Sequence, residues 1–344
     1  MTLLRSSALA SSLLAASLTG CAHTPQGAPP AAPEVQVFTS DDSGFHTNSA
    51  WIDTGHEVVV FDTQFTPALA QSLLDTIQAA TDSPVRWAVI THPNPDKFNG
   101  ASVFAEAGAT IVASEATAAA MPGVHDYKKA YFVGAGMFTE DTYPPLPTVD
   151  LVFEQTLDLP VDGAAVQLVE LANPGVTTNQ TVARVGDSVV VGDLVAAETH
   201  AWLEGGIVEG AAVPDVDGWR AALDELLTLV GPETTVVPGR GPTLPAGEVL
   251  PAASAYLARA QGVTTSYIDG LQDPAAALSE DGNTHYAALA ELLSFGARHG
   301  LETERSLEIL GETPLLSPAA KASGAAARGE GRAWSSSVRC RRAR

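Results

Sequence analysis

The fold is decided by seven consecutive residues, Thr91-His92-Pro93-Asn94-Pro95-Asp96-Lys97, which directly follow the apolar run Val85–Ile90. A short, continuous apolar run of this kind predicts a buried strand. An imidazole, a carboxamide, a carboxylate and an ammonium group are therefore grouped just beyond a strand end, where functional loops commonly lie. The stretch predicts both a layered α/β fold and a site at the edge of its sheet.

The residues on either side alternate between strand and helix patterns. Thr66-Pro67 is an N-cap and first-turn pair, and the apolar stripe from Leu69 to Ile77 after it has helical spacing. A second helix is predicted at Gly100–Ala107. The strands predicted in this half are Val35–Phe38, Ala50–Ile52, Val58–Asp62, Val85–Ile90 and Thr110–Ala113.

The second half repeats this organisation and predicts the other half of one sandwich. Its helix is predicted at Val216–Leu229. Its strands are predicted at Val166–Leu171, Thr181–Val185, Ser188–Val191 and Thr235–Val237. Beyond Pro245 only helical patterns follow, and they predict an α-helical C-terminal extension at Ala252–Gln261, Tyr286–Phe295 and Leu301–Leu310.

The N-terminus has the pattern of an export signal. One cation, Arg5, precedes the uncharged run Ser6–Thr19, which is too short to span a bilayer. The run ends in Leu18-Thr19-Gly20-Cys21, which resembles the lipobox of bacterial lipoproteins, and Pro-rich residues 21–33 follow as a tether. We therefore expect residues 1–20 to be a signal peptide and Cys21 to be lipidated. Ala22 then favours the outer membrane, facing the periplasm; the alternative is an ordinary signal sequence with a cysteine after it.

Composition and charge limit the partners. The chain has 344 residues, 45% of them hydrophobic, which is ample for a folded core. A formal net charge of −22 excludes nucleic acid as a partner, because a phosphate backbone would be repelled over most of the surface. The expected contacts are a small-molecule ligand or an envelope protein, with the membrane reached through the N-terminal lipid. Residues 313–344 are predicted to be a disordered basic tail.

Five landmarks carry a family resemblance because of their order and their places at strand ends. They are Asp62-Thr63, His92-x-Asn94-x-Asp96-Lys97, Asn173-Pro174-Gly175-Val176-Thr177, Val191-Gly192-Asp193 and Pro238-Gly239-Arg240. In this order the landmarks resemble those of the metallo-β-lactamase fold superfamily, whose members are mostly zinc-dependent hydrolases. The resemblance implies a four-layer αβ/βα sandwich over residues 34–245, followed by the helical extension at 246–312.

The resemblance also implies a dizinc site that is degenerate in this chain. Of the implied ligands, His92, Asp96 and Asp193 are retained. The superfamily has histidines at the positions of four other residues, which are here Asn94, Lys97, Val176 and Arg240.

These replacements change the chemistry of the site. Val176 offers no ligand atom, and an amide oxygen from Asn94 is a poor zinc ligand beside an imidazole. Arg240 cannot lose its proton, and Lys97 loses its own only with difficulty. We expect the two cations to neutralise Asp96 and Asp193 in place of the metals, so that zinc is absent or present at reduced occupancy.

Three interpretations of the function remain at this point. The first is a lipid-anchored protein with an eroded site that binds a ligand with little or no catalysis. The second is a hydrolase of an ester, lactone or β-lactam that uses a single metal ion in place of two. In this interpretation Asp96 and Asp193 hold the ion or orient the attacking water, and His46 or His200 supplies a further ligand. The third is a purely structural envelope component. In the first two, we expect the pocket to be lined by Asn94, Lys97, Val176, Arg240, His200, Trp202 and the Tyr127–Pro145 segment. His125 is predicted to lie in a solvated loop.

Overall fold

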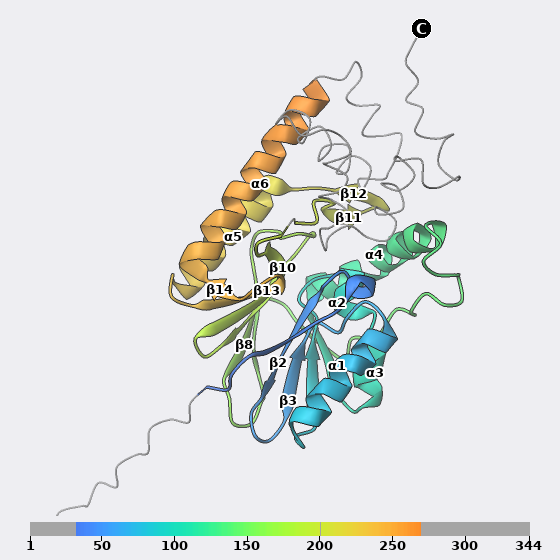
Figure 1. Ribbon diagram of the computed structural model, residues 1–344, viewed down its shortest axis with the longest axis vertical. Coiled ribbons are helices and arrows are strands. Elements are labelled where there is room, and N and C mark those ends of the chain that lie inside the picture. Colours follow the sequence, from blue (N-terminus) through green and yellow to red (C-terminus); the bar gives the residue numbers. More distant parts are fainter. Residues whose placement is uncertain (1–31, 200, 270–344) are drawn as a thin grey trace, which may run out of the picture. The chain divides into compact units, whose positions relative to one another are not determined.

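A computed structural model describes residues 32–199 and 201–269 of the chain. In this part of the chain, two six-stranded sheets and a two-stranded hairpin are formed, and helices cover the outer faces of the two large sheets (Figure 1). The chain is thus a four-layer αβ/βα sandwich, and the predicted fold class is confirmed.

The first sheet has the strand order β1-β2-β3-β4-β5-β6. Its first three strands form an antiparallel meander, and β3 to β6 run parallel to one another. The strands are β1 (Gln36–Thr39), β2 (Asn48–Asp53), β3 (Val58–Phe61), β4 (Val85–Val89), β5 (Thr110–Ser114) and β6 (Leu151–Phe153). Because parallel strands end at the same edge, the loops after β3, β4 and β5 meet there.

Helix α1 (Pro67–Ala80) connects β3 to β4 and begins at the predicted cap. The Thr66 hydroxyl accepts a hydrogen bond from the Leu69 amide at 3.2 Å. Its buried stripe contains Ala70, Leu73, Leu74 and Ile77. Complete burial of one such leucine contributes about 1.5–3 kcal/mol to stability.

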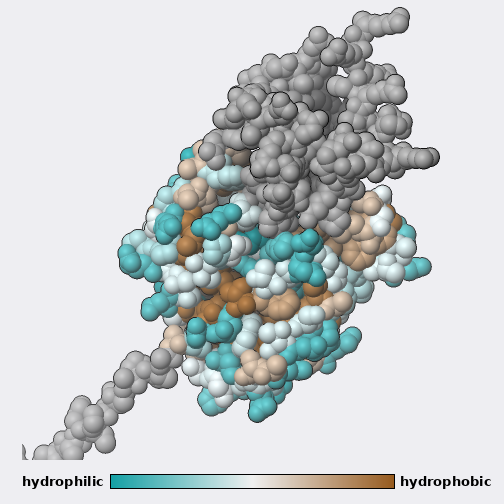
Figure 2. Space-filling view, viewed as in Figure 1, coloured by the Kyte–Doolittle hydropathy of each residue, from teal (hydrophilic) through white to brown (hydrophobic). Residues whose placement is uncertain are grey.

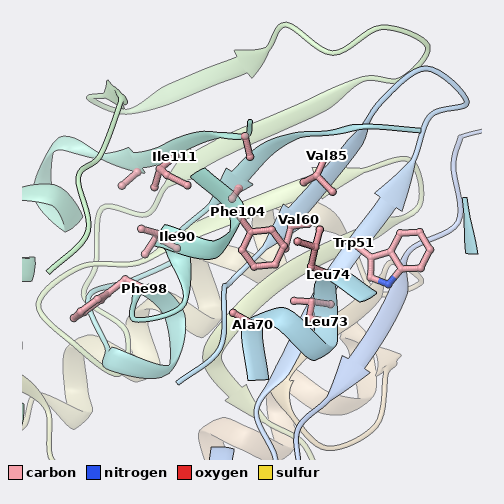
Figure 3. Close-up of a cluster of buried hydrophobic side chains, with 14 of the residues drawn as sticks. Trp51, Val60, Ala70, Leu73, Leu74, Val85, Ile90, Phe98, Phe104 and Ile111 are labelled. Atoms are coloured by element: carbon pink, nitrogen blue, oxygen red, sulfur yellow. The ribbon is translucent and has the colours of Figure 1, made fainter. Parts of the chain in front are cut away.

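Alternation along the strands places one hydrophobic layer on each face of the first sheet. Val58 and Val60 pack against α1 and α3 (Ala101–Glu106), and Figure 3 shows Val60 among the side chains of this layer. Val59 and Phe61 point to the opposite face and pack between the two sheets. The alternation therefore places one hydrophobic layer between the sheet and its helices and a second one between the two sheets.

The second sheet has the order β14-β13-β10-β9-β8-β7. Only β10 and β13 are parallel in it. The strands are β7 (Thr156–Leu159), β8 (Val166–Glu170), β9 (Thr181–Val185), β10 (Ser188–Ala196), β13 (Thr235–Arg240) and β14 (Leu244–Pro245). A separate hairpin, β11 (Gly206–Val208) and β12 (Ala211–Val213), follows β10.

Helices α5 (Val216–Val230) and α6 (Ala246–Asp269) form the outer layer over the second sheet. Helix α6 starts where the helical extension was predicted, and Val249, Leu250 and Leu257 pack its first half onto the sandwich. The predicted helices at residues 286–295 and 301–310 lie outside the described residues. So do Cys21, the predicted signal peptide and basic tail, and most of the predicted tether.

The prediction for His125 was wrong. His125 lies in α4 (Glu115–Gly134), is buried, and its Nε2 atom lies 2.9 Å from the Pro144 carbonyl oxygen. Pro122 and Gly123 within this stretch indicate a helix break. The helix nevertheless continues, because its buried residues, among them Met121 and Phe132, pack on the protein core. Tertiary packing here outweighs a local breaker.

A few large hydrophobic residues are exposed on the described part of the chain. Figure 2 shows hydrophilic and hydrophobic residues side by side on the visible face. The exposed large hydrophobic residues are Val37, Leu146, Val152, Val208 and Val213. Among the described helices, none combines the length and the hydropathy needed to cross a membrane.

Candidate functional site

The candidate site lies at the strand ends where the two sheets meet. Asp62 follows β3 directly, and residues 91–97 follow β4. Asp193 lies within β10, and Arg240 is the last residue of β13. Residues that are far apart in the sequence therefore converge from both halves of the sandwich.

A short helix positions the two charged residues of the 91–97 stretch. Helix α2 (Pro95–Phe98) has Asn94 as its N-cap and Pro95 in its first turn. The Lys97 carbonyl oxygen accepts two bonds from Thr63, from the backbone amide and from the hydroxyl, each at 2.8 Å. This turn holds Asp96 and Lys97 inside the protein, where they are 5% and 0% exposed.

Glycines allow the second sheet to approach this turn closely. Gly192 has a φ of 52°, and a Cβ atom on it would lie 2.3 Å from the Thr91 hydroxyl oxygen. A Cβ atom on Gly239 would lie 2.0 Å from an Asp193 carboxylate oxygen. Neither position accommodates a side chain, so these two motif glycines are explained by close packing.

Lys97 and Arg240 each bind both buried carboxylates. Lys97 Nζ lies 2.9 Å from Asp96 Oδ2 and 2.8 Å from Asp193 Oδ1. Arg240 Nη2 lies 2.9 Å from Asp96 Oδ2, and Arg240 Nη1 lies 2.5 Å from Asp193 Oδ2. The predicted pairing of the two cations with the two carboxylates is confirmed. We call these four residues the charge cluster.

The charge cluster also joins the two sheets through neighbouring polar groups. Arg240 Nε donates to the Phe45 carbonyl at 3.2 Å, and Nη2 donates to the Thr47 hydroxyl at 3.1 Å. That hydroxyl donates in turn to Asp96 at 2.9 Å. Asn48 of β2 donates to the carbonyl of Pro238 at 3.0 Å and to that of Gly241 at 2.9 Å.

The ion pairs determine the protonation of the cluster. Burial raises the pKa of Asp193, but Arg240 and Lys97 outweigh it and hold that pKa well below its usual value. The pKa of Asp96 is also lowered, because Lys97 and Arg240 together outweigh its burial and the repulsion from Asp193. Burial lowers the pKa of Lys97, yet the two carboxylates raise it above its usual value. All four side chains are therefore charged at neutral pH.

A small cavity lies beside the cluster. Its volume is about 40 Å³, enough for a few water-sized groups. Its walls are formed by Phe45, Phe65, Asn94, Pro95, Asp96, Lys128, Phe132, Asp193, Trp202 and Arg240. The cavity therefore combines aromatic rings with charges that already have partners.

Several of the predicted pocket residues do line this cavity, and others do not. Asn94, Trp202 and Arg240 line it, as do Lys128 and Phe132 from the predicted Tyr127–Pro145 segment. Asp96 and Asp193, predicted as residual metal ligands, line it as well. Val176, in contrast, is buried in the apolar layer beneath α5 and is absent from the lining. Lys97 is fully buried behind the wall, and His200 lies outside the described residues.

Phe45 and Phe65 were not predicted as pocket residues. Phe65 follows Asp62 by three positions, so its place in a loop after a strand was the available signal. Phe45 has a φ of 62° beside η1 (Asp42–Gly44), and no sequence pattern indicates that this turn reaches the cavity. The Phe45 and Phe65 ring centroids lie 4.9 Å apart.

Another part of the cavity wall is held in place by a buried ion pair. Lys128 of α4 pairs with Glu204, and both side chains are almost completely buried. The Trp202 indole donates to Glu204 at 2.8 Å, and Lys128 Nζ lies 5.3 Å from the centroid of the Trp202 ring. Trp202 is thereby fixed against α4 at the cavity.

The remaining candidate ligand does not reach the site. His46 Nε2 lies 2.7 Å from Asp42 Oδ1, four residues away on the surface. His46 thus does not complete the single-metal site that the sequence left open.

His92 lies between two other side chains of the site. Its Nε2 atom is 3.7 Å from Asp193 Oδ2 and 3.3 Å from Asn94 Nδ2.

The architecture and the landmarks identify the class of protein. Residues 42–241 match the family model of the metallo-beta-lactamase superfamily, and the chain belongs to this superfamily. A comparison with curated proteins gave no match.

Solved structures similar to the chain include metallo-beta-lactamases. FIM-1 from Pseudomonas aeruginosa, in its mono-zinc form, is 16% identical at a TM-score of 0.49, covering 66% of this chain and 90% of its own. The enzyme from Pontibacter korlensis is 19% identical at 0.49, covering 65% and 99%. TMB-1 is 17% identical at 0.48, covering 67% and 99%.

The residues present do not fit the zinc ions that the superfamily implies. Within the described residues, no group of three or more His, Cys, Asp or Glu could hold a metal ion. The Lys97 ammonium group instead lies between the two carboxylates. A unit positive charge within ~4 Å of another costs about 4 kcal/mol at an effective dielectric of 20, so a dication beside Lys97 is strongly opposed.

The first prediction concerns the stability that the charge cluster provides. Lys97→Met should lower the free energy of unfolding by about 3–5 kcal/mol, because it leaves a net negative charge buried. The control is Lys129→Met, which breaks a partly exposed ion pair with Glu140 and should cost less than about 1 kcal/mol. Urea unfolding measures both, and similar small losses would contradict the prediction.

The second prediction concerns pH. Burial raises the pKa of Asp62 to about 6, whereas an unfolded aspartate has a pKa of about 3.9. The folded protein therefore holds this proton more tightly, and Asp62 makes stability fall as pH rises from about 4 to about 6. Between pH 4 and pH 7 the wild type should lose about 2 kcal/mol relative to Asp62→Asn. Urea unfolding of both proteins at the two pH values measures this loss. The prediction is wrong if the difference in free energy of unfolding between wild type and Asp62→Asn is the same at pH 4 and pH 7.

Proposed function

We propose that this protein is a binding protein of the superfamily, in which fixed side-chain charges replace the two metal ions. The observation that supports this is the position of Lys97 Nζ, within 2.9 Å of both Asp96 and Asp193. Arg240 binds the same two carboxylates. Ammonium and guanidinium groups neutralise the carboxylates, but they do not lower the pKa of a bound water as zinc does.

The ligand in this proposal is a small molecule held in the cavity beside the cluster. The aromatic rings of Phe45, Phe65 and Phe132 and the indole of Trp202 provide apolar contact area. Asn94 and Arg240 provide polar groups at the same wall. A cavity of about 40 Å³ suits a small ligand or one small group of a larger one.

The alternative, a hydrolase with a reduced metal site, has less support. It needs His92, Asp96 and Asp193 to turn towards one ion together with a further ligand. Both carboxylates are instead committed to cations, and His46 is bound to Asp42. The purely structural interpretation gives no reason for a cavity with polar and aromatic walls.

The third prediction tests the replacement of metal. Protein purified without chelator or added zinc should contain far less than one zinc per chain and should not hydrolyse a chromogenic lactam or ester above background. Lys97→His with Arg240→His should bind more zinc than the wild type, because imidazoles then replace both cations. Elemental analysis and an absorbance assay measure these quantities.

Two results would overturn the proposal. One is near-stoichiometric zinc in the wild type that is lost in Asp193→Asn. The other is turnover by the wild type that a chelator abolishes. Lys129→His is the matched control for the double variant, because it adds an imidazole at a partly exposed ion pair outside the cavity.

We further propose that the protein is exported and anchored by a lipid on Cys21, in the outer membrane and facing the periplasm. The uncharged run Ser6–Thr19, the small residue Gly20 and the Pro-rich residues after Cys21 support this. The partners proposed with it are a small-molecule ligand or another envelope protein.

The fourth prediction tests the anchor. Cys21→Ser should move the protein from the membrane fraction to the soluble fraction and remove the incorporation of labelled fatty acid, because the acylated thiol is absent. Cys340→Ser, which replaces the other cysteine of the chain, serves as the control and should change neither result. Membrane association that persists in Cys21→Ser would refute lipidation at this residue.

A further inference from the structure

A continuous chain of hydrogen bonds runs from a buried carboxylate to the wall of the cavity. Asp62 accepts from the Thr91 amide at 2.9 Å and from the Thr91 hydroxyl at 3.0 Å. Thr91 Oγ1 lies 2.9 Å from His92 Nδ1. His92 Nε2 lies 3.3 Å from Asn94 Nδ2, and Asn94 lines the cavity. The first three residues are at most 1% exposed.

The carboxylate sets the direction of the hydrogen bonds in this chain. An ionised Asp62 can only accept, so the single hydroxyl proton of Thr91 is donated to it. Thr91 Oγ1 must then accept from His92 Nδ1, which places the proton of the neutral imidazole on Nδ1. His92 Nε2 is left as an acceptor for the Asn94 amide group.

The competing partner of His92 is too distant to reverse this assignment. Asp193 Oδ2 lies 3.7 Å from His92 Nε2, beyond the usual range for an N–H···O bond. The same oxygen is bound by Arg240 Nη1 at 2.5 Å. The Asn94 amide nitrogen is closer to His92 and is the better partner.

The orientation of Asn94 follows from the state of His92. Because Nδ2 is directed at His92, the amide oxygen is directed elsewhere, and no donor to it occurs among the described residues. The other polar groups of the cavity wall, Asp96, Asp193, Arg240 and Lys128, are all in ion pairs. The Asn94 oxygen is thus the acceptor that a ligand can satisfy.

We propose that Asp62, Thr91 and His92 act as positioning residues that make Asn94 a hydrogen-bond acceptor, so that the cavity selects small uncharged ligands carrying an N–H or O–H donor. This inference extends the proposed binding function and depends on it for the ligand. The absence of charge follows from the ion pairs around the cavity, since a charged ligand would find no free countercharge there. The apolar part of the ligand would face the rings of Phe65 and Phe132.

The fifth prediction concerns the His92 tautomer. In histidine labelled with ¹⁵N, at pH 8, the wild type should show His92 protonated on Nδ1 alone, with the signal assigned by its loss in His92→Gln. Thr91→Ser should keep this state. In Asp62→Asn the new amide donates to Thr91 Oγ1, the hydroxyl donates to His92 Nδ1, and the proton should move to Nε2.

Three outcomes would contradict the proposed direction of the hydrogen bonds from Asp62 to Asn94, called here the relay. They are a proton on Nε2 alone in the wild type, protons on both nitrogens in the wild type, and an unchanged tautomer in Asp62→Asn. If Asp62→Asn does not fold, Thr91→Val serves instead. It removes the hydroxyl, and His92 should then lose its fixed tautomer, whereas an unchanged Nδ1–H signal would contradict the relay.

The same samples test the ligand class with acetamide and acetone, which have similar sizes and share a carbonyl group; acetamide carries an NH₂ group where acetone carries a methyl group. Acetamide should bind the wild type about fivefold more tightly in an NMR titration, the effect of one hydrogen bond. Asn94→Leu should remove that difference. Equal binding, or no binding of acetamide, would refute the ligand class even where the tautomer is as expected. The binding function itself is tested separately by zinc content and turnover, so its failure can be distinguished from failure of the ligand class.

Discussion

The structure depends on four charges that are buried together and sum to zero. Asp96 and Lys97 come from the turn after β4 in the first sheet, and Asp193 and Arg240 come from β10 and β13 in the second. Removing an ion from water costs several kcal/mol, and this cost is offset only when opposite charges lie within contact distance. The cluster is therefore stable as a set, and it joins the two sheets at the edge where the loops converge.

This constraint explains how two carboxylates can stay buried side by side at the strand ends. The two carboxylates of a metal site cannot remain buried alone, because each would carry an uncompensated charge. A lysine and an arginine supply the compensation through covalently attached groups, whose positions are fixed by α2 and by the end of β13.

Much of the fold could be predicted because its signals are local. The cap at Thr66, the apolar stripe of α1 and the strand at Thr181–Val185 follow from spacing within a few residues. Helix α4 was missed because Pro122 has the local meaning of a break, whereas distant core contacts keep the helix intact. Of the candidate site, the ion pairs were predictable from charge complementarity. The burial of Val176 in the apolar layer and the entry of Phe45 into the cavity wall were not.

The sequence by itself determined the superfamily landmarks, their order and the presence of two cations where the resemblance implies histidine ligands. These properties depend on residue identity and spacing, which the chain carries directly. Only the tertiary structure decided that Lys97 contacts both carboxylates, that Trp202 is held by Glu204, and that His92 lies between Thr91 and Asn94. Hydrogen-bond direction and ion-pair geometry depend on distances of a few tenths of an ångström between groups distant in the chain. Those distances exist only after both sheets have packed.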